Sequence, residues 1–499
     1  MVHILLAPGL FNYANMQIML DWSHPISGII LQRLTGAPLY RQVADALEDI
    51  IIKGIMSVGE RLPSERVASE MLKVDRSTVT AAYRLLKEKG LVESRVGSGV
   101  RVAESRASSP LVINAATERL IELMTRPSGS VAVPMIADFE YVVPNLDALP
   151  MKLIRSIMDD VLREEGDQLL QYGDSLGYSP LRKTLGERLG VPADRILITS
   201  GAQQALALAF GVLSESQRTI GIEAPTYSGA VQLVKYHGLR SVSVPVTDEG
   251  WDMTALEQRH TNLVYIQPCH QNPTGRTMGK DDLDRIFHLV RRHSLTVIED
   301  GGDAIFWGGE PLFRRLPRNS TVHIGSLSKF ILPGLRIGWL TGPLPFVSAV
   351  RMLKGATDVH TSHLLQAVLH RLLHFPELTD AIHKEMEHQM EIWKRARNLA
   401  KRLLPDSVRI VSGEGSSWMF LYLPEGMTAS HVVQDLLNRG VRVSVGSYFF
   451  AHRPAPEAVR LALGAMDPKS MEKGFQILGE VLEDRSRQSL TQTAGLPPL

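Results

Sequence analysis

The sequence has a single cysteine, Cys269, among its 499 residues. One cysteine excludes an internal disulfide and a cysteine-based zinc cluster, so the chain is compatible with a reducing cytoplasm, where we expect it to act. Long apolar runs are missing as well. The first twenty residues lack a basic segment and are interrupted by Pro8, Gly9 and Asn12, so we predict neither a signal peptide nor a membrane span.

The beginning of the chain carries little structural signal. Met16 and Met19 are alternative start sites to Met1, and the sequence leaves the true start open. We therefore expect residues 1–37 to form an N-terminal extension of uncertain order.

Excess charge of either sign is also absent, since the net charge is only +1. With 44% hydrophobic and 21% charged residues, the composition is that of soluble globular proteins, and the length predicts two or more domains. The charge is unevenly distributed. Residues 76–101 have six basic and two acidic residues, a local charge of +4: Arg76, Arg84, Lys87, Lys89, Arg95 and Arg101 against Glu88 and Glu93.

Three helices are predicted in this basic region and just before it. Apolar residues recur three and four positions apart over residues 38–54. Ser64 is placed to cap a second helix that ends at Met71, and Asp75 to cap a third that ends near Lys89. The third helix has an apolar face of Val79, Ala82, Tyr83 and Leu86 and a polar face of Arg76, Ser77, Thr80 and Arg84.

A wing follows the third helix. The stretch LVESRVGSGVRVAE, residues 91–104, predicts two short strands about a turn at Gly97-Ser98-Gly99. Three helices and such a wing form a winged helix-turn-helix, a DNA-binding fold, which we predict over residues 38–103.

The remainder alternates short apolar runs with helical stretches, which is typical of an α/β domain with a mostly parallel sheet. The runs are RILITS, RTIGIEA, NLVYIQP, LTVIED and TVHIGS. We predict a linker over residues 104–130, this domain over 131–484 and a disordered tail over 485–499. Parallel sheets bind ligands at the carboxyl ends of their strands, so the residues after each run are candidates for a site.

A coherent set of groups follows these runs. The first run leads into a helix at Gly201-Ala202-Gln203, whose N-terminus is suited to a phosphate. The later runs lead to an aromatic ring, an amide, a carboxylate and an amine: Tyr227, Asn272, Asp300 and Lys329. Together these groups would hold a phosphorylated aromatic aldehyde.

This region resembles the fold-type I aminotransferases, which use pyridoxal phosphate (PLP). The resemblance implies that Lys329 forms the Schiff base with PLP, that Asp300 pairs with the pyridine nitrogen and that Arg460, in VRLALG, binds a substrate carboxylate. The other implied cofactor contacts are Asn272 at the ring oxygen, Tyr227 stacked on the ring, Gly201, Ala202, Gln203, Ser326 and Arg336 at the phosphate, and Tyr172 at the phosphate of a neighbouring subunit.

Taken singly, these residues have simpler explanations. Asp300 alone would serve equally as a helix cap and Tyr227 as core packing, and it is their order along five strand ends that favours a cofactor site. The histidine pairs His360/His363 and His383/His388 lack a third ligand at metal-binding spacing, so we predict no metal site.

The N-terminal segment resembles the GntR type of winged helix-turn-helix over its whole length. The resemblance implies that the bases and phosphates of double-stranded DNA are contacted by Arg66, Arg76, Ser77, Thr78, Thr80, Gly97, Ser98 and Gly99. Asp75 departs from the family, which commonly has a small hydroxyl residue there, and its charge is expected to alter the site preference.

A GntR-type reader joined to an aminotransferase-like domain is the architecture of the MocR/GabR regulators. The resemblance implies a homodimer that binds operator DNA and senses an amine, an amino acid or PLP. We hypothesise that an effector amine replaces Lys329 on the cofactor aldehyde and that the resulting aldimine shifts the large domain.

One departure bears on catalysis. These regulators often have a tyrosine two residues after the strand carboxylate, but this chain has Gly302, so we expect PLP binding with weak transamination. Two alternatives remain: an active aminotransferase with an accessory DNA-binding domain, and a regulator that no longer binds PLP. The sequence does not reveal the effector, the target genes or the sign of regulation.

Overall fold

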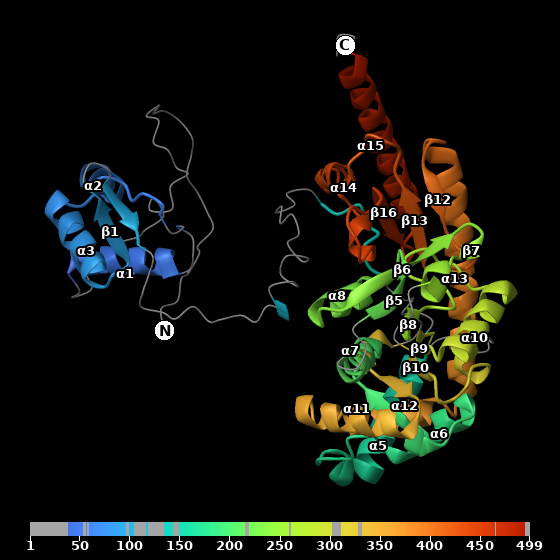
Figure 1. Ribbon diagram of the computed structural model, residues 1–499. Coiled ribbons are helices and arrows are strands. Elements are labelled where there is room, and N and C mark those ends of the chain that lie inside the picture. Colours follow the sequence, from blue (N-terminus) through green and yellow to red (C-terminus); the bar gives the residue numbers. More distant parts are fainter. Residues whose placement is uncertain are drawn as a thin grey trace. The chain divides into compact units, whose positions relative to one another are not determined.

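The computed structural model describes residues 38–103, 116–117 and 134–494, with gaps at 53–55, 57–58, 96–98, 143–148, 215–218, 259–260, 302–310, 328–331 and 465. The chain divides into two compact units, Met1–Ile113 (unit 1) and Asn114–Leu499 (unit 2) (Figure 1). Four residues with predicted roles fall in the gaps and lie outside the described residues: Gly97, Ser98, Gly302 and Lys329.

Unit 1 consists of three helices and a two-stranded antiparallel sheet. The elements are α1 (Leu39–Ile52), α2 (Glu65–Leu72), α3 (Arg76–Glu88), β1 (Val92–Arg95) and β2 (Gly99–Val102). Strands β1 and β2 pair from Val92↔Val102 to Arg95↔Gly99, which is the predicted wing. The predicted winged helix-turn-helix fold is therefore confirmed.

The helix faces of unit 1 follow the sequence pattern. The predicted apolar face of α3 is buried in one core with residues of α1, and the buried set includes Val43, Leu47, Val79, Ala82, Tyr83 and Leu86. Ser64 caps α2 as predicted, because its hydroxyl accepts a hydrogen bond from the Val67 N–H at 3.4 Å. Asp75 precedes α3 as predicted, but its carboxylate makes no capping hydrogen bond.

Unit 2 is built on an eight-stranded sheet in the order β4-β11-β10-β9-β8-β5-β6-β7. The strands are β4 (Ile196–Thr199), β5 (Thr219–Ala224), β6 (Arg240–Thr247), β7 (Gly250–Trp251), β8 (Leu263–Ile266), β9 (Thr296–Asp300), β10 (Thr321–Ser326) and β11 (Gly338–Thr341). Strand β11 is antiparallel to both neighbours and β7 to β6, whereas β10-β9-β8-β5-β6 pair in parallel. The predicted mostly parallel α/β sheet is confirmed, and its central strands are buried on both faces, as near-continuous apolar runs require.

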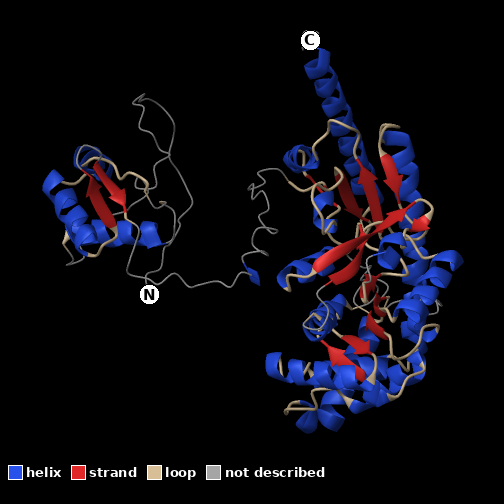
Figure 2. Ribbon diagram, viewed as in Figure 1, coloured by secondary structure: helices blue, strands red, loops and turns tan. Residues whose placement is uncertain are grey.

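Helices cover this sheet (Figure 2). They are α5 (Met151–Leu169), α6 (Ser179–Leu189), α7 (Ala202–Leu213), α8 (Ser228–Tyr236), α9 (Thr254–Gln258), α10 (Lys280–His293), α11 (Leu344–Thr357), α12 (His363–Leu372) and α13 (Pro376–Leu403). Helix α7 packs on β10 and β11 and also touches α8 and α11. Helix α7 is therefore held in place by contacts with both strands and helices.

A smaller part of unit 2 contains a four-stranded antiparallel sheet in the order β12-β13-β16-β15. Its elements, with two further helices and a parallel strand pair, are β12 (Arg409–Val411), β13 (Trp418–Tyr422), β15 (Ser444–Val445), β16 (Ala458–Ala462), α14 (Ala429–Asn438), α15 (Pro468–Ala494), β3 (Ala137–Asp138) and β14 (Val441–Arg442). Its core contains Phe139, Trp393, Phe475 and Leu478.

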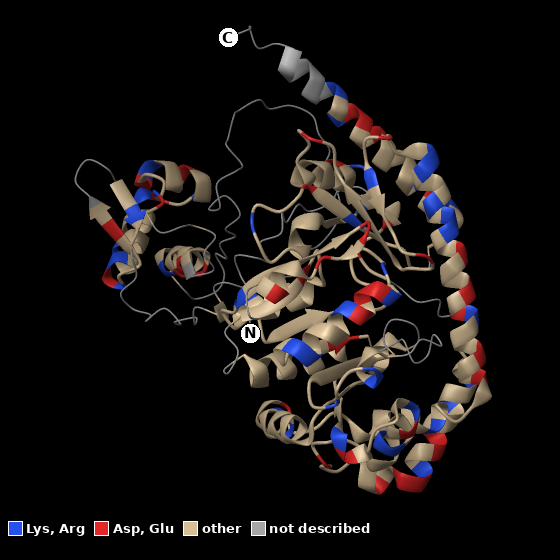
Figure 3. Cartoon of the chain, turned by 45° about the vertical axis from the view of Figure 1, so that its right-hand side comes forward, with Lys and Arg blue, Asp and Glu red and all other residues tan. Residues whose placement is uncertain are grey.

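Helix α13 joins the two parts of unit 2. Leu378 and Ile382, in its first half, belong to a core shared with α5, α6 and α12, whereas Trp393 and Ala396, further along, belong to the core of the smaller sheet. Figure 3 shows both signs of charge interspersed on the helices of unit 2. None of the helices among the described residues is long and apolar enough to cross a membrane.

The C-terminal helix extends beyond our expectation. Helix α15 continues to Ala494, so residues 485–494, which we predicted to be disordered, are described as helix. The apolar residues Leu478, Val481 and Leu482 anchor its earlier turns in the core of the smaller sheet.

Candidate functional site

Three strand ends of the large sheet meet in one row. In the register of the sheet, Ser326 at the end of β10 is opposite Gly338, and Gly338 is opposite Thr199 at the end of β4. Only Ser200 and Gly201 separate the end of β4 from Ala202, the first residue of α7. The predicted phosphate residues after β4, after β10 and before β11 are therefore brought together.

Arg336 lies over the start of α7. Its Nη2 donates to the carbonyl oxygen of Ser200 at 3.3 Å. A Cβ at Gly201, where φ is +90°, would lie 2.8 Å from the same Nη2, and a Cβ at Gly338 would lie 2.6 Å from the carbonyl carbon of Gly201. Glycine at both positions lets the guanidinium and the helix start come close, which is an arrangement suited to a phosphate.

The predicted ring carboxylate has a partner that sequence reasoning missed. The hydroxyl of Tyr265, on β8, donates to Oδ2 of Asp300, at the end of β9, at 2.7 Å. Tyr265 is wholly buried, and burial, followed by the charge of Asp300, raises the pKa of its phenol well above the usual value. The signal was present in NLVYIQP, since a tyrosine inside an apolar strand needs a partner for its hydroxyl.

Tyr227 and Gln203 both lie against Gly229. A Cβ added there would be 2.5 Å from the Tyr227 ring and 2.5 Å from Oε1 of Gln203. The aromatic residue after β5 is thus held beside the first turn of α7. Tyr227 also lines a cavity of about 300 Å³, together with Asn272, Trp418, Ser444, Phe449 and Arg460.

Arg460, on β16, is the cation of this cavity. Its Nη1 donates to Oδ1 of Asn272 at 3.4 Å, and its Nη2 donates to Oγ of Ser444 at 2.9 Å and to the Glu140 carbonyl oxygen at 2.6 Å. Nε has no hydrogen-bond partner among the described residues. Two predicted residues are thus in direct contact, although Asn272 lies in the loop after β8 of the large sheet and Arg460 lies on β16 of the smaller one.

The guanidinium of Arg460 is desolvated. The residue is 8% exposed and lies over the rings of Trp418 and Phe449, at 4.8 and 4.9 Å from the two ring centroids. Burial lowers its pKa to about 10, and the charge of Glu140 acts in the opposite direction. Arg460 remains a cation at neutral pH, and within the described residues it has no ion pair, which favours a carboxylate on the ligand.

A buried glutamate supports the Asn272 turn, and sequence reasoning did not identify it. Glu223, near the end of β5, accepts hydrogen bonds from Nε1 of Trp251 (2.7 Å), from the Gln267 N–H (3.0 Å) and from Nε2 of Gln271 (3.2 Å). Gln267 in turn bonds the backbone of Asn272, accepting from its N–H at 3.3 Å and donating to its carbonyl at 3.2 Å. The Glu223 side chain therefore holds the two glutamines that hold the Asn272 loop, although Glu223 itself does not line the cavity around Arg460.

Tyr172 lies apart from this cavity. Its side chain is 89% exposed, and its ring meets the ring of His360 edge-on at 6.1 Å. The structure therefore does not bring Tyr172 to the site of its own chain. The described residues contain no cluster of three or more His, Cys, Asp or Glu side chains placed to hold a metal ion.

In unit 1, the predicted DNA-contacting residues lie on the exposed sides of α2 and α3. Arg66, Arg76, Ser77 and Thr80 are exposed, and Thr78 is half-buried. Arg76 forms an ion pair with Glu65 at 3.3 Å, and the Thr80 hydroxyl donates to the Arg76 carbonyl at 3.0 Å.

At the wing, Gly99 lies against a guanidinium. A Cβ at Gly99 would be 2.9 Å from Nε of Arg61. Sequence reasoning missed both Arg61 and Glu65 as neighbours of the predicted contacts, because neither lies in α3 or in the turn of the wing.

Comparisons with known proteins give a family for each unit. Residues 144–478 match the aminotransferases of class I and II, and residues 39–102 match the bacterial regulatory proteins of the gntR family. The chain is similar to a 2-aminoadipate transaminase of Thermus thermophilus, with 30% identity over 385 residues that cover 74% of this chain and 94% of the relative.

Another relative spans both units. The probable rhizopine catabolism regulatory protein MocR of Rhizobium meliloti is 25% identical over 493 residues, which cover 94% of this chain and 98% of the relative. Among solved structures, the alpha-aminoadipate aminotransferase LysN of Thermus thermophilus, complexed with N-(5'-phosphopyridoxyl)-L-leucine, is 27% identical with a TM-score of 0.67. That match covers 75% of this chain and 96% of LysN.

Glu223 generates a prediction about stability and pH. Burial raises its pKa to about 7 from the ordinary 4.5, so the folded state holds the proton more tightly than the unfolded state. This contribution to stability is fully present below pH 4.5 and is lost as the pH rises through about 7. We expect the free energy of unfolding of the wild type, minus that of Glu223→Gln, to fall by on the order of 3 kcal/mol over this window in urea titrations.

Glu249→Gln is the control, because Glu249 is an exposed glutamate in the turn between β6 and β7. A wild-type minus Glu223→Gln difference that stays constant with pH would contradict the raised pKa.

Proposed function

Because the chain belongs to the aminotransferase class I and II family and carries a gntR-family domain ahead of it, we propose that it is a PLP-dependent transcriptional regulator of the MocR type whose larger unit binds an amino-acid effector. The fusion carries this proposal. The transaminase relative aligns with 74% of the chain, whereas the regulator MocR aligns with 94%, including the DNA-binding unit. A regulator accounts for both units, and an enzyme accounts only for unit 2.

The residues at the strand ends fit the cofactor. The phosphate would be bound by the start of α7, Arg336 and Ser326, and the pyridine nitrogen by Asp300, which Tyr265 holds in place. Tyr227 would cover the ring face and Asn272 would bind the ring oxygen. When bound, PLP supplies an aldehyde that condenses with amines, and Lys329 is the proposed attachment point.

The cavity supports an effector with a carboxylate. Arg460 is a buried cation, held by Asn272 and Ser444, and it lacks an ion pair among the described residues. An amino acid would provide a carboxylate for Arg460 and an amine for the cofactor aldehyde. Trp418 and Phe449 flank the guanidinium and would exclude water from the ion pair that forms.

The effector acts on DNA binding only through a difference in affinity between two states of the protein. We propose a homodimer, in which Tyr172, exposed on its own chain, contributes to the neighbouring subunit's phosphate site. A change at the paired large units then alters how the two DNA-binding units engage an operator.

Lys329→Ala tests the sensor. We expect the variant to lose the visible absorption of protein-bound PLP and the effect of amino acids on operator affinity, while its basal DNA binding stays within about twofold of the wild type. Absorption spectra and fluorescence anisotropy of labelled operator DNA measure the two properties. Loss of DNA binding in a folded variant would contradict the sensor role, and steady keto-acid release by the wild type at about 1 to 1000 per second would favour the aminotransferase alternative.

Arg460→Met tests the carboxylate site. Hydrogen bonds to charged groups contribute about 1.5–3 kcal/mol, so we expect the affinity for the responding amino acid to fall roughly 10- to 100-fold. The affinity for the corresponding amine, which is the same molecule without its carboxylate, should change little. The amino acid to use is found by titrating the wild type with each of the twenty amino acids and recording the PLP absorption during each titration.

Arg409→Met is the matched control, because Arg409 stacks on Tyr422 at 3.9 Å and does not line the cavity. Equal losses for the amino acid and for its amine in Arg460→Met would exclude a carboxylate contact.

Arg76→Ala tests the DNA interface. If Arg76 exchanges Glu65 for a base edge, its loss should weaken operator binding by about 1–3 kcal/mol and relax the sequence preference. Arg84→Ala is the charge-matched comparison, because it also removes one positive charge from the exposed side of α3, where Arg84 lies 3.9 Å from Glu88. Equal weakening on operator and unrelated DNA in Arg76→Ala would reduce its role to a phosphate contact.

A further inference from the structure

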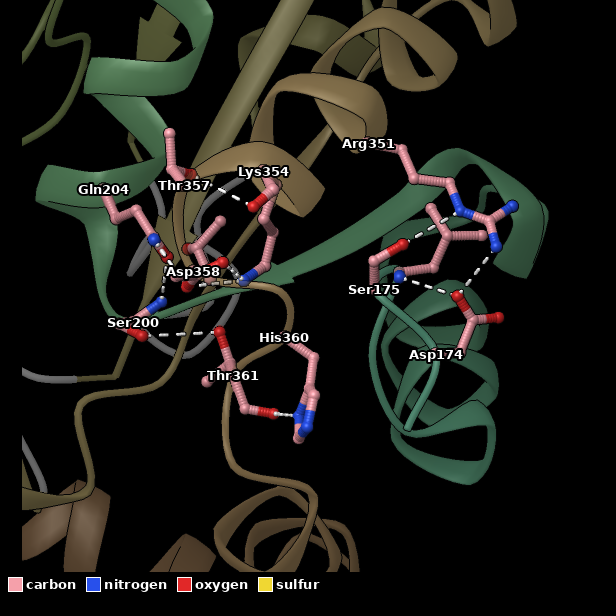
Figure 4. A network of polar contacts seen from close by, with 12 residues as sticks. Asp174, Ser175, Ser200, Gln204, Arg351, Lys354, Thr357, Asp358, His360 and Thr361 are labelled. Carbon is pink, nitrogen blue, oxygen red and sulfur yellow. Dashed lines mark hydrogen bonds and ion pairs between the residues drawn. The ribbon is translucent and has the colours of Figure 1, made fainter. Parts of the chain in front are cut away.

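An ion pair with a buried lysine lies at the end of α11, beside the loop that precedes α7 (Figure 4). Nζ of Lys354 bonds both carboxylate oxygens of Asp358, at 2.5 and 2.7 Å. The Lys354 side chain is wholly buried, whereas that of Asp358 is 26% exposed. Neither residue lines the cavity around Arg460, so this pair has a role other than contact with the effector there.

Gln204 connects this ion pair to the loop. Its Nε2 donates to Oδ2 of Asp358 at 2.7 Å, and its Oε1 accepts from the backbone N–H of Ser200 at 2.7 Å. Figure 4 shows the Gln204 side chain between these two residues. A side-chain amide has one donor end and one acceptor end, so the carboxylate of Asp358 determines which end faces Ser200.

Ser200 is held from several sides as a result. Its N–H is bound by Gln204, its carbonyl accepts from Arg336, and its hydroxyl lies 3.4 Å from that of Thr361. Ser200 immediately precedes Gly201, the N-cap residue of α7. Fixing the Ser200 peptide therefore fixes the direction of the first free N–H groups of the helix, which are the groups that an anion would meet.

Energetics favour a positioning role for this pair. A buried ion pair contributes little net stability, because desolvation of both charges offsets their attraction, but removal of one partner is costly. The N–H of Ser200 needs only one acceptor, which Gln204 supplies. The additional buried pair ensures that Gln204 presents its oxygen to that N–H.

We propose that Gln204, Asp358 and Lys354 are positioning residues for the cofactor phosphate: the Lys354–Asp358 pair orients the Gln204 amide, which holds the Ser200–Gly201 turn so that Arg336 and the start of α7 face one phosphate. This proposal rests on the proposed function, since it concerns the same PLP site. It assigns a role to three residues that do not themselves touch the cofactor.

The test compares PLP with pyridoxal, which has the same ring and aldehyde but no phosphate. Dissociation constants of both are measured for the full-length chain by quenching of tryptophan fluorescence. We expect Gln204→Leu and Lys354→Met to raise the dissociation constant of PLP by about tenfold or more, and that of pyridoxal by less than about twofold. A general loss of folding would weaken both ligands alike, so the ratio of the two constants separates positioning from stability.

Arg351→Met is the matched control. Arg351 lies on the same helix one turn before Lys354, but its side chain bonds Asp174 and Ser175, at 3.1 Å each, away from the α7 loop. Both dissociation constants should remain at the wild-type values in this variant. Asp358→Leu removes the oxygen that accepts from Gln204 while keeping a similar volume, and it replaces Gln204→Leu or Lys354→Met should either fail to fold.

The outcomes separate the two proposals. A wild-type chain that binds neither compound, or binds both equally, contradicts the proposed PLP site itself. A wild type that prefers PLP, with an unchanged preference in the folded variants, overturns the positioning role and leaves the proposed function intact. A lost preference in the three network variants, but not in Arg351→Met, supports the positioning role.

Discussion

The buried guanidinium of Arg460 is the constraint on which the site depends. It lies on β16 of the smaller sheet, yet it bonds Asn272, which follows β8 of the large sheet. A charge of this kind is costly to bury without an anion, and the described residues provide carbonyl and hydroxyl oxygens and two aromatic rings but no ion pair. Fold and ligand chemistry are therefore linked: the two sheets meet around a cation that a carboxylate would complete.

Buried polar groups behind the site keep the strand ends in place. Glu223 accepts from Trp251 and from the glutamines that bond the Asn272 turn, and Asp300 is held by Tyr265. Burial raises the pKa of Glu223, so its ionised form is costly at neutral pH. The buried Glu223 carboxylate thus fixes the geometry of the Asn272 loop and lowers the stability of the fold at neutral pH. Such a loss of stability is common at functional sites.

Local patterns in the sequence predicted the helices and strands well. They did not predict the contacts between residues that are far apart in the sequence. The cap at Ser64 and the buried face of α3 depend on spacings of three and four residues, and the strand-end residues depend on the order of apolar runs. The Tyr265–Asp300 and Gln204–Asp358 bonds join residues 35 and 154 positions apart. Their partners follow from the strand order and from the packing of α11 on α7, which no short stretch of sequence encodes.

The same limit applies to Asp75. Its type and place predicted a side-chain cap for α3, but its carboxylate makes no such bond in the structure. Position at a helix start is a local property, whereas the rotamer of an exposed carboxylate depends on its surroundings, including any phosphate that approaches it. Residues at recognition surfaces are thus the ones whose contacts are least determined by sequence pattern.

The two walls of the cavity come from different parts of unit 2. Tyr227 and Asn272 lie in loops that follow strands β5 and β8 of the large sheet, whereas Trp418 and Arg460 lie on β13 and β16 of the smaller one, and all four line the same cavity. A ligand that contacts both walls has an affinity that depends on their separation. Linkage then requires the ligand to favour the arrangement in which both walls contact it, because only a difference in affinity shifts an equilibrium. Because α13 is packed into the cores of both parts, any change in the separation of the two walls has to repack apolar contacts along this helix.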